Sequence, residues 1–415
     1  MLQHSINNKV SYAGVALIFF YAYDLFYMIM QKVTSNEFIA KASTLLILYM
    51  ILAVAFLKSP KIKYLWGISV IFFCAVIFMV SYLIHPEYEN AMFYMPSWNI
   101  WNSVFTFSSG IFACLFFQMF DDANTLRRYL KYAGYLILIW CIFRISSAIA
   151  KGGFYRTMEN GSVSMNTYDM LLGYRLLFVS IIFGVEFQKE SKNVRFIYIG
   201  ISIVTFILMI IYGSRTATVS FIVFWILKSV FCKGKEKSNK RIFKIVFMLI
   251  LSLLIYIILT NEVILTYFKN ILENIGINSR ILDSMIEGSI TLDKGRESIW
   301  INAWKMILEN PIIGNGVYAD RYIFGIYCHQ IILEVLLNFG VFAGTLIILF
   351  LIWNSCNILL KCKNSEWKLL FILFLSMVII RLNVSSSFWN DTNFWACLII
   401  GSKALKETPK IKIVI

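Results

Sequence analysis

Runs of about 20 apolar residues constrain this chain more than any other feature. A helix of about that length is needed to cross the hydrocarbon core of a bilayer. Hydrophobic residues make up 59% of the 415 positions and charged residues only 15%, which is more apolar surface than a soluble core can bury. We count roughly twelve runs of spanning length, at residues 10–30, 38–57, 64–84, 97–120, 130–150, 167–187, 195–212, 215–232, 242–260, 330–356, 368–387 and 391–405. The sequence therefore predicts an all-α polytopic membrane protein with residues 1–415 as one membrane domain.

The positive charge is placed in alternate loops between these runs. The formal net charge is +15, and lysine and arginine cluster near residues 58–63, 127–131, 189–195, 233–244, 361–368 and 403–412. This is the positive-inside pattern of a plasma membrane protein and gives no reason to expect nucleic acid as a partner. It predicts cytoplasmic termini and outward-facing loops at 31–37, 85–96, 151–166, 261–329 and 388–390.

The eight cysteines lie scattered along the chain, most of them inside apolar runs. No two of them have the spacing of a metal knuckle or a disulfide framework. We expect neither a metal site nor a disulfide framework.

The outward-facing segment 261–329 is too long for a simple connection, and such segments are usually functional. Residues 297–310 within it have helical periodicity. One face carries Ile299, Trp300, Ala303, Trp304, Ile307 and Leu308. We predict a helix that lies in the plane of the membrane surface, ended by Pro311 and followed by a turn at Gly314–Gly316.

Charged residues inside the apolar runs fall mostly in the halves assigned to the outer leaflet. A charge at the bilayer centre costs about 2.5–3.5 kcal/mol, and such residues usually face a cavity. The residues concerned are Arg144, Arg175, Arg215, Glu334 and Arg381, with Asp24 and Lys41 at similar depth. They predict an outward-facing, water-accessible, electropositive cavity that binds substrate.

The turn Gly213-Ser214-Arg215-Thr216 lies between two apolar runs. The hydroxyl of Ser214 could cap the following helix, whose free N–H groups would form an anion site together with the Arg215 guanidinium. A phosphate or diphosphate suits a guanidinium fork. The alternative is a plain turn from which Arg215 reaches the lipid headgroups.

A histidine stands at the entrance of the run 330–356, near two further arginines. His329 has an unperturbed pKa near 6.5 and could take a proton from a hydroxyl group, or it could serve only as a structural cap. Arg296 and Arg321 lie in the same outer segment as candidate partners, although Arg296 could equally contact lipid headgroups. Glu334 lies a little more than one helical turn further on.

Together these motifs resemble the O-antigen polymerase and O-antigen ligase superfamily. The resemblance rests on Gly213–Thr216 after an apolar run; on Gly295-Arg296, Trp300, Ala303, Trp304, Pro311 and Gly314–Gly316 in the outer segment; and on His329 with Leu333, Leu336 and Gly340. It covers about a third of the chain. Gln330 departs from the pattern, since an asparagine or similar small residue often follows the histidine.

The resemblance implies a metal-independent, membrane-embedded glycosyltransferase with a GT-C-like fold and no cofactor. Its donor would be an oligosaccharide on polyprenyl diphosphate, and its acceptor a second lipid-linked unit, at the outer face of a bacterial inner membrane. Arg215 and Arg296 would hold the diphosphate, and His329 would orient or deprotonate the attacking hydroxyl. Membrane lipids, a flippase and a chain-length regulator would be further partners.

Three other functions compete with a polymerase. A ligase would pass the finished glycan to another acceptor and would need the same diphosphate site. A flippase or secondary transporter predicts charges through the whole bilayer depth and internal repeats with broken helices. A non-enzymatic anchor leaves the charges within the membrane unexplained.

Overall fold

The computed structural model describes residues 11–408 except for 59–61, 97–98, 107–109, 151–155, 158–162, 165–169, 188–190, 213, 233–260, 275–285 and 287–295. In the first half the helices are α1 (Tyr12–Tyr21), α2 (Tyr23–Thr34), α3 (Glu37–Lys58), α4 (Ile62–Ile84), η1 (Pro86–Tyr88), η2 (Asn90–Tyr94), α5 (Ile100–Ser103), α6 (Ala113–Gln118), α7 (Ala123–Ala150), α8 (Met170–Glu186) and α9 (Lys192–Ile211). The second half adds α10 (Arg215–Phe231), α12 (Glu262–Asn274), α14 (Arg296–Glu309), α15 (Ala319–Phe324), α16 (Ile331–Lys361), α17 (Ser365–Val384) and α18 (Thr392–Lys406). One antiparallel ladder joins β1 (Arg156–Thr157) and β2 (Val163–Ser164).

Six helices among the described residues are long and apolar enough to cross a membrane. They are Glu37–Lys58, Tyr64–Ile84, Ala123–Ala150, Lys192–Ile211, Ile331–Lys361 and Ser365–Val384. A seventh candidate is the pair α1 and α2, which are bent by 72° at the break between them. The protein is therefore a mostly helical, multi-pass membrane protein. The predicted run 242–260 lies outside the described residues.

The predicted span 97–120 is not one helix. The described residues form two short helices, α5 and α6, with a turn before α6. A side-chain carbon at Gly110 in this turn would lie only 2.7 Å from the carbonyl oxygen of Asn390. The backbone is therefore packed tightly against the segment before α18, and this contact holds it in a turn.

The predicted span 330–356 is interrupted at Gly340. This residue has φ 75° and ψ 173° inside α16, a conformation that glycine adopts easily. A side-chain carbon there would lie 2.5 Å from the carbonyl oxygen of Ile312. Val341 N–H donates to the Pro311 carbonyl at 2.7 Å, and Asn315 N–H donates to the Leu337 carbonyl at 2.7 Å. The turn after α14 is thus bound into the break in α16.

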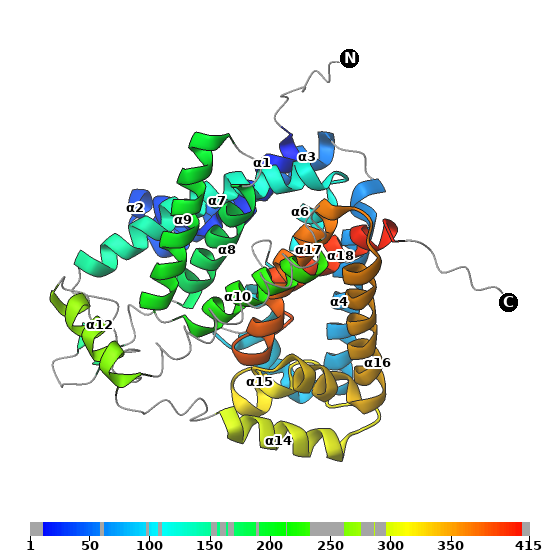
Figure 1. Cartoon of the computed structure of the whole chain (residues 1–415). Helices are drawn as coiled ribbons and strands as arrows, with labels where there is room; N and C mark the ends of the chain where they lie inside the picture. Colours follow the sequence, from blue (N-terminus) through cyan, green and yellow to red (C-terminus); the bar gives the residue numbers. More distant parts are fainter. Residues whose placement is uncertain are drawn as a thin grey trace.

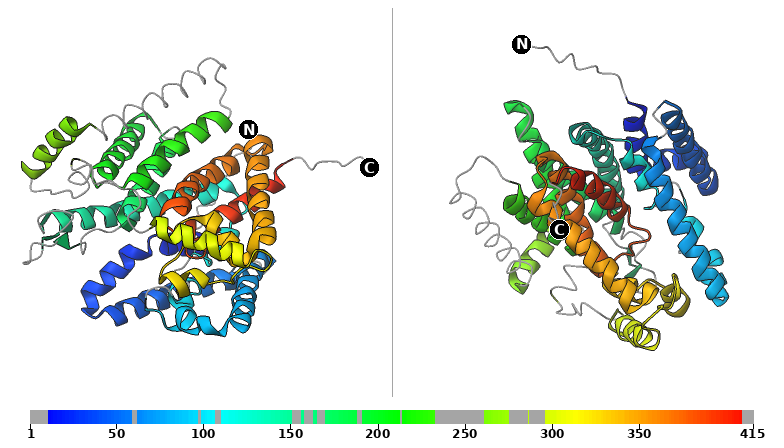
Figure 2. Two further views of the ribbon diagram at one scale, coloured as in Figure 1. Left: turned by 90° about the horizontal axis from the view of Figure 1, so that it is seen from below. Right: turned by 90° about the vertical axis from the view of Figure 1, so that its right-hand side faces the viewer.

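The predicted helix in the outer segment is present as α14, one residue earlier than expected. Ala303 and Ile307 are fully buried, and α14 packs against α16. Trp304 and Leu308 were expected on the same apolar face but are 48% and 61% exposed. Figures 1 and 2 show α14 lying across one end of α16. Its orientation in the membrane plane stays a prediction, with the exposed flank available to lipid.

Three helices form the middle of the bundle: α17 packs against both α10 and α18. Helices α7, α8 and α9 pack in series on one side, and α4 and α6 pack on another (Figure 1). A side-chain carbon at Gly173 in α8 would lie 2.2 Å from the Oγ of Ser214. This close approach brings the start of α10 against α8.

Replacing Gly340 by alanine is expected to destabilise the protein. A backbone with φ 75° and ψ 173° is almost exclusive to glycine and costs another residue about 1–3 kcal/mol, and the added carbon would clash with Ile312. A matched control is Gly200→Ala in α9, where the added carbon meets nothing within 4 Å. That change should leave stability equal or raise it by about 0.5–1 kcal/mol. Thermal unfolding in detergent measures both, and equal unfolding temperatures for the two variants would contradict the strained break.

Candidate site around His329 and its arginines

A fully buried ion-pair cluster joins α15, near the end of the outer segment, to the first turn of α16. Arg321, Asp320 and Glu334 have side chains with no exposed area. Arg321 Nη1 donates to both oxygens of Asp320 and to Oε1 of Glu334, each at 2.8 Å. Its Nη2 donates to Ser387 Oγ at 2.6 Å. Burial alone would lower the pKa of Arg321, but the two carboxylates outweigh burial and raise it.

These contacts change the interpretation of two predicted substrate-binding residues. Arg321 was expected to bind substrate near His329, and Glu334 was expected to line an open cavity. Both side chains are buried, and they form an ion pair with each other. Because neither side chain has an exposed atom that could contact substrate, we assign both residues to the packing of the site.

His329 lies beside this cluster in an unusual backbone conformation, with φ 57°. Its half-buried ring lies 4.3 Å from that of Tyr327, and Nδ1 has no hydrogen-bond partner among the described residues. Burial, and then the positive charges of Arg296 and Arg321, lower the pKa of His329 to about 4. The imidazole is therefore neutral at pH 7 and able to accept a proton.

Arg381, at the end of α17, connects to the histidine through aromatic side chains. Its Nε lies 3.1 Å from Oδ2 of Asp391, and its guanidinium carbon lies 4.2 Å from the centre of the Tyr174 ring. The Tyr174 hydroxyl lies 2.5 Å from Ser385 Oγ. Tyr327, the ring beside the histidine, donates its hydroxyl hydrogen to the Ser385 carbonyl at 3.1 Å. One polar network therefore joins α8, α17 and the outer segment.

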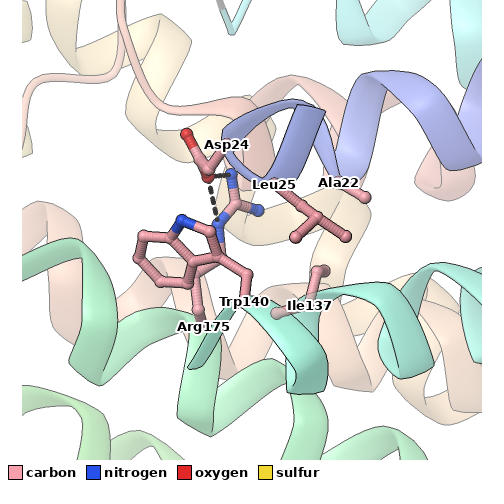
Figure 3. A pocket seen from close by; sticks show the side chains of 6 residues that line it. All are labelled: Ala22, Asp24, Leu25, Ile137, Trp140 and Arg175. Atoms are coloured by element: carbon pink, nitrogen blue, oxygen red, sulfur yellow. Dashed lines mark hydrogen bonds and ion pairs between the residues drawn. The ribbon is translucent and has the colours of Figure 1, made fainter. Parts of the chain in front are cut away.

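Arg175 lies at the break between α1 and α2, where it pairs with Asp24 (Figure 3). The Nε and Nη2 atoms of Arg175 lie 2.9 and 2.6 Å from Oδ2 of Asp24. The pair borders a shallow hollow lined by Ala22, Asp24, Leu25, Ile137, Trp140 and Arg175. Next to it, Tyr21 donates its hydroxyl hydrogen to Oδ1 of Asn393 at 2.7 Å, which links this end to the segment that holds Asp391.

The three remaining arginines lie at the edges of the site. Arg144 is exposed and lies 5.8 Å from the ring of Trp140, which lines the hollow. Arg215 is the half-exposed first residue of α10. Arg296 is the half-buried first residue of α14, close enough to His329 to lower the pKa of the imidazole.

The expected cap by Ser214 is wrong. Ser214 precedes α10, but its side chain makes no capping hydrogen bond. The close contact with Gly173 explains this, because the hydroxyl packs against α8. Gly213, the first residue of the predicted turn, lies outside the described residues.

The expected excess of positive charge is smaller than the sequence suggested. Arg175, Arg321 and Arg381 each face at least one carboxylate, from Asp24, from Asp320 and Glu334, and from Asp391 respectively. The partners come from elements far apart in the chain, so their pairing was not visible in the sequence.

Sequence reasoning also missed the short segment between α17 and α18. Ser385, Ser387 and Asp391 in this segment, and Asn393 in the first turn of α18, supply partners to the network. The signal was the polar sequence SSSFWNDTN between two apolar runs, of which we treated only 388–390 as an outer loop. Ser387 and Asp391 contact Arg321 and Arg381, while Ser385 and Asn393 contact Tyr174 and Tyr21, and these contacts distinguish the segment from an ordinary connection.

The fold and the site define a multi-pass membrane protein with a neutral histidine beside a network of arginines. Residues 200–349 match the family described as O-antigen ligase. The matched part includes α10, α14, the buried cluster, His329 and the break in α16, and it confirms the resemblance to the O-antigen polymerase and ligase superfamily. No significant match is found among curated proteins or among solved structures.

Replacing Arg321 by leucine is expected to cost about 3–5 kcal/mol, because two buried carboxylates lose their shared cation. Thermal unfolding and the monodisperse fraction in detergent measure this loss. The control is Lys305→Ala on the exposed side of α14, which should stay within about 0.5 kcal/mol of the parent. A leucine variant as stable as the control would show that the cluster contributes little.

Stability should depend on pH through His329. Its pKa is about 4 in the folded chain against 6.5 for a free histidine, so the unfolded chain binds more protons between these values. Stability contributed by the neutral ring is therefore present above pH 6.5 and is lost as the pH falls toward 4. The unfolding temperature of the parent should drop more over this range than that of His329→Gln; parallel curves would contradict the lowered pKa.

Proposed function

We propose that this protein polymerises polyprenyl-diphosphate-linked oligosaccharide repeat units into O-antigen or capsular polysaccharide. The family match supports O-antigen polymerisation or ligation by a membrane glycosyltransferase-like enzyme. The observation that carries the proposal is the half-buried imidazole of His329, whose Nδ1 has no hydrogen-bond partner among the described residues. Burial, and then the charge of Arg296, lower its pKa.

In the proposed reaction a hydroxyl oxygen of the acceptor sugar attacks the anomeric carbon of the donor. The bond between that carbon and the diphosphate oxygen breaks, and the diphosphate leaves with the bonding electrons. His329 accepts the hydroxyl proton, a role worth about 10²- to 10⁴-fold in rate. Arg215 and Arg296 stabilise the charge that develops on the leaving diphosphate.

We place the reaction at the outer face of the bacterial inner membrane. The basic loops support cytoplasmic termini, so the outer segment with α14 and His329 would face outward. There the polyprenyl tail of a substrate stays in the bilayer while its diphosphate reaches the arginines. A flippase that delivers the substrate and a chain-length regulator are the partners proposed with this placement.

Two other functions are supported by specific observations. The description of the matched family favours a ligase that transfers glycan to a different acceptor. The break between α1 and α2, with an ion pair beside it, favours a transporter, in which broken helices often carry binding sites. Reconstitution in vesicles with a lipid-linked repeat unit separates the three: longer glycan indicates a polymerase, transfer to an added acceptor a ligase, and translocation alone a transporter.

Arg215→Ala is expected to leave the protein in the membrane and to abolish long polymer, because the diphosphate loses a charged partner. The ladder of glycan lengths on a gel measures this. Arg128→Ala on the exposed side of α7 is the matched control and should give the parental ladder. An unchanged ladder for Arg215→Ala would reject its diphosphate role.

His329→Ala should bind donor normally and lower turnover by about 10²- to 10⁴-fold. Donor binding and chain growth are measured separately on the purified protein. His85→Ala is the control, since His85 pairs with Glu87 outside the site and should not affect turnover strongly. Normal chain growth without the His329 imidazole would remove it from the mechanism.

A further inference from the structure

We infer that Trp300 and Asp320 are positioning residues that together hold the backbone at His329 in its left-handed conformation. Trp300 Nε1 donates to the carbonyl oxygen of Cys328 at 2.9 Å. From the other side, Cys328 N–H donates to Oδ2 of Asp320 at 3.1 Å. The residue before the histidine is therefore held at both of its peptide groups.

The hydrogen bond from Trp300 holds the peptide group next to His329, and the bond to Asp320 holds the peptide group before it. The Cys328 carbonyl belongs to the same peptide plane as the His329 nitrogen, and φ is the rotation away from that plane. A φ of 57° is uncommon for a residue with a side chain and persists only where its surroundings impose it. On the far side, Gln330 is extended and its carbonyl accepts from Glu334 N–H at 2.9 Å, which anchors the chain at the start of α16.

The buried ion pairs make this arrangement rigid. Asp320 is fixed by Arg321 through two contacts of 2.8 Å and through the Arg321 backbone N–H at 2.9 Å. Arg321 is in turn held by Glu334 in α16 and by Ser387 before α18. The cluster thus connects Glu334, at the start of α16, to Asp320, which accepts the hydrogen bond from Cys328 N–H. Arg321 and Glu334, which are fully buried, would thus help to position His329 without contacting substrate.

Trp304 provides a matched comparison on the same helix. It lies just over one turn after Trp300 in α14 and is 48% exposed. Replacing either tryptophan by phenylalanine removes an indole N–H and little volume. Only the change at Trp300 removes a donor from the Cys328 carbonyl.

The expected effect on catalysis rests on the proposed role of His329. The positioning of the His329 backbone by Trp300 and Asp320 does not depend on that role. The test therefore first measures the imidazole directly in the purified full-length protein. Diethyl pyrocarbonate acylates neutral imidazoles, and the chain has three histidines. Mass spectrometry of the labelled peptides gives the labelling rate of His329 relative to His85, which serves as an internal reference.

Trp300→Phe is expected to raise the ratio of His329 labelling to His85 labelling more than threefold. Without the hydrogen bond to Cys328 the backbone can move, and the imidazole of His329 becomes more exposed to the reagent. Trp304→Phe should keep the parental ratio. In polymer synthesis Trp300→Phe should lower kcat about 5- to 30-fold, the factor for 1–2 kcal/mol, with KM nearly unchanged. An unchanged labelling ratio overturns the positioning inference. A raised ratio with full polymer synthesis upholds it and rejects the proposed role of His329.

A second pair of variants tests the backbone without Trp300, should Trp300→Phe fail to fold. Glycine adopts a positive φ without penalty, whereas alanine does not. His329→Gly should therefore unfold at a higher temperature than His329→Ala. Equal or reversed unfolding temperatures would show that the structure does not impose the left-handed conformation.

Discussion

The pairing of arginine with carboxylate inside an apolar bundle is the interaction on which this structure depends. A guanidinium left alone in such surroundings would be costly, and a carboxylate likewise. Ion pairs offset this cost. They join Arg175 to Asp24, Arg321 to Asp320 and Glu334, and Arg381 to Asp391. Each pair joins different elements, apart from the neighbours Asp320 and Arg321, so the charges set which helices can lie together.

The helical, multi-pass character was predictable from the sequence, because the bilayer imposes the length and composition of a spanning helix. Of the roughly twelve predicted spans, six, or seven with the bent pair α1 and α2, are long and apolar enough among the described residues. The boundaries of α3, α4, α9 and α17 lie close to their apolar runs, whereas α7 begins at Ala123, well before its predicted run 130–150. Helix α14 was expected from its periodicity and from Pro311. The exceptions depend on tertiary contacts. Gly110 and Gly340 interrupt predicted spans because a distant backbone segment packs where a side chain would lie.

The sequence singled out the charged residues of the candidate site but not the residues that contact them. Intramembrane arginines and His329 stand out in any apolar sequence, since charge there is rare. Their partners do not stand out: Ser385 and Ser387 are ordinary residues until α17 and α18 bring them to Tyr174 and Arg321. The same applies to Trp300, which looked like part of an apolar face and donates to the peptide beside His329.

The break at Gly340 determines how the outer segment can move. Hydrogen bonds from Val341 and Asn315 tie the turn after α14 to both halves of α16. A flap hinged at that turn would have to open these bonds, so we expect α14 and α16 to travel as a single rigid body. Under the proposed function, a glycan beside α14 would then meet a surface that keeps its position relative to α16 throughout the reaction.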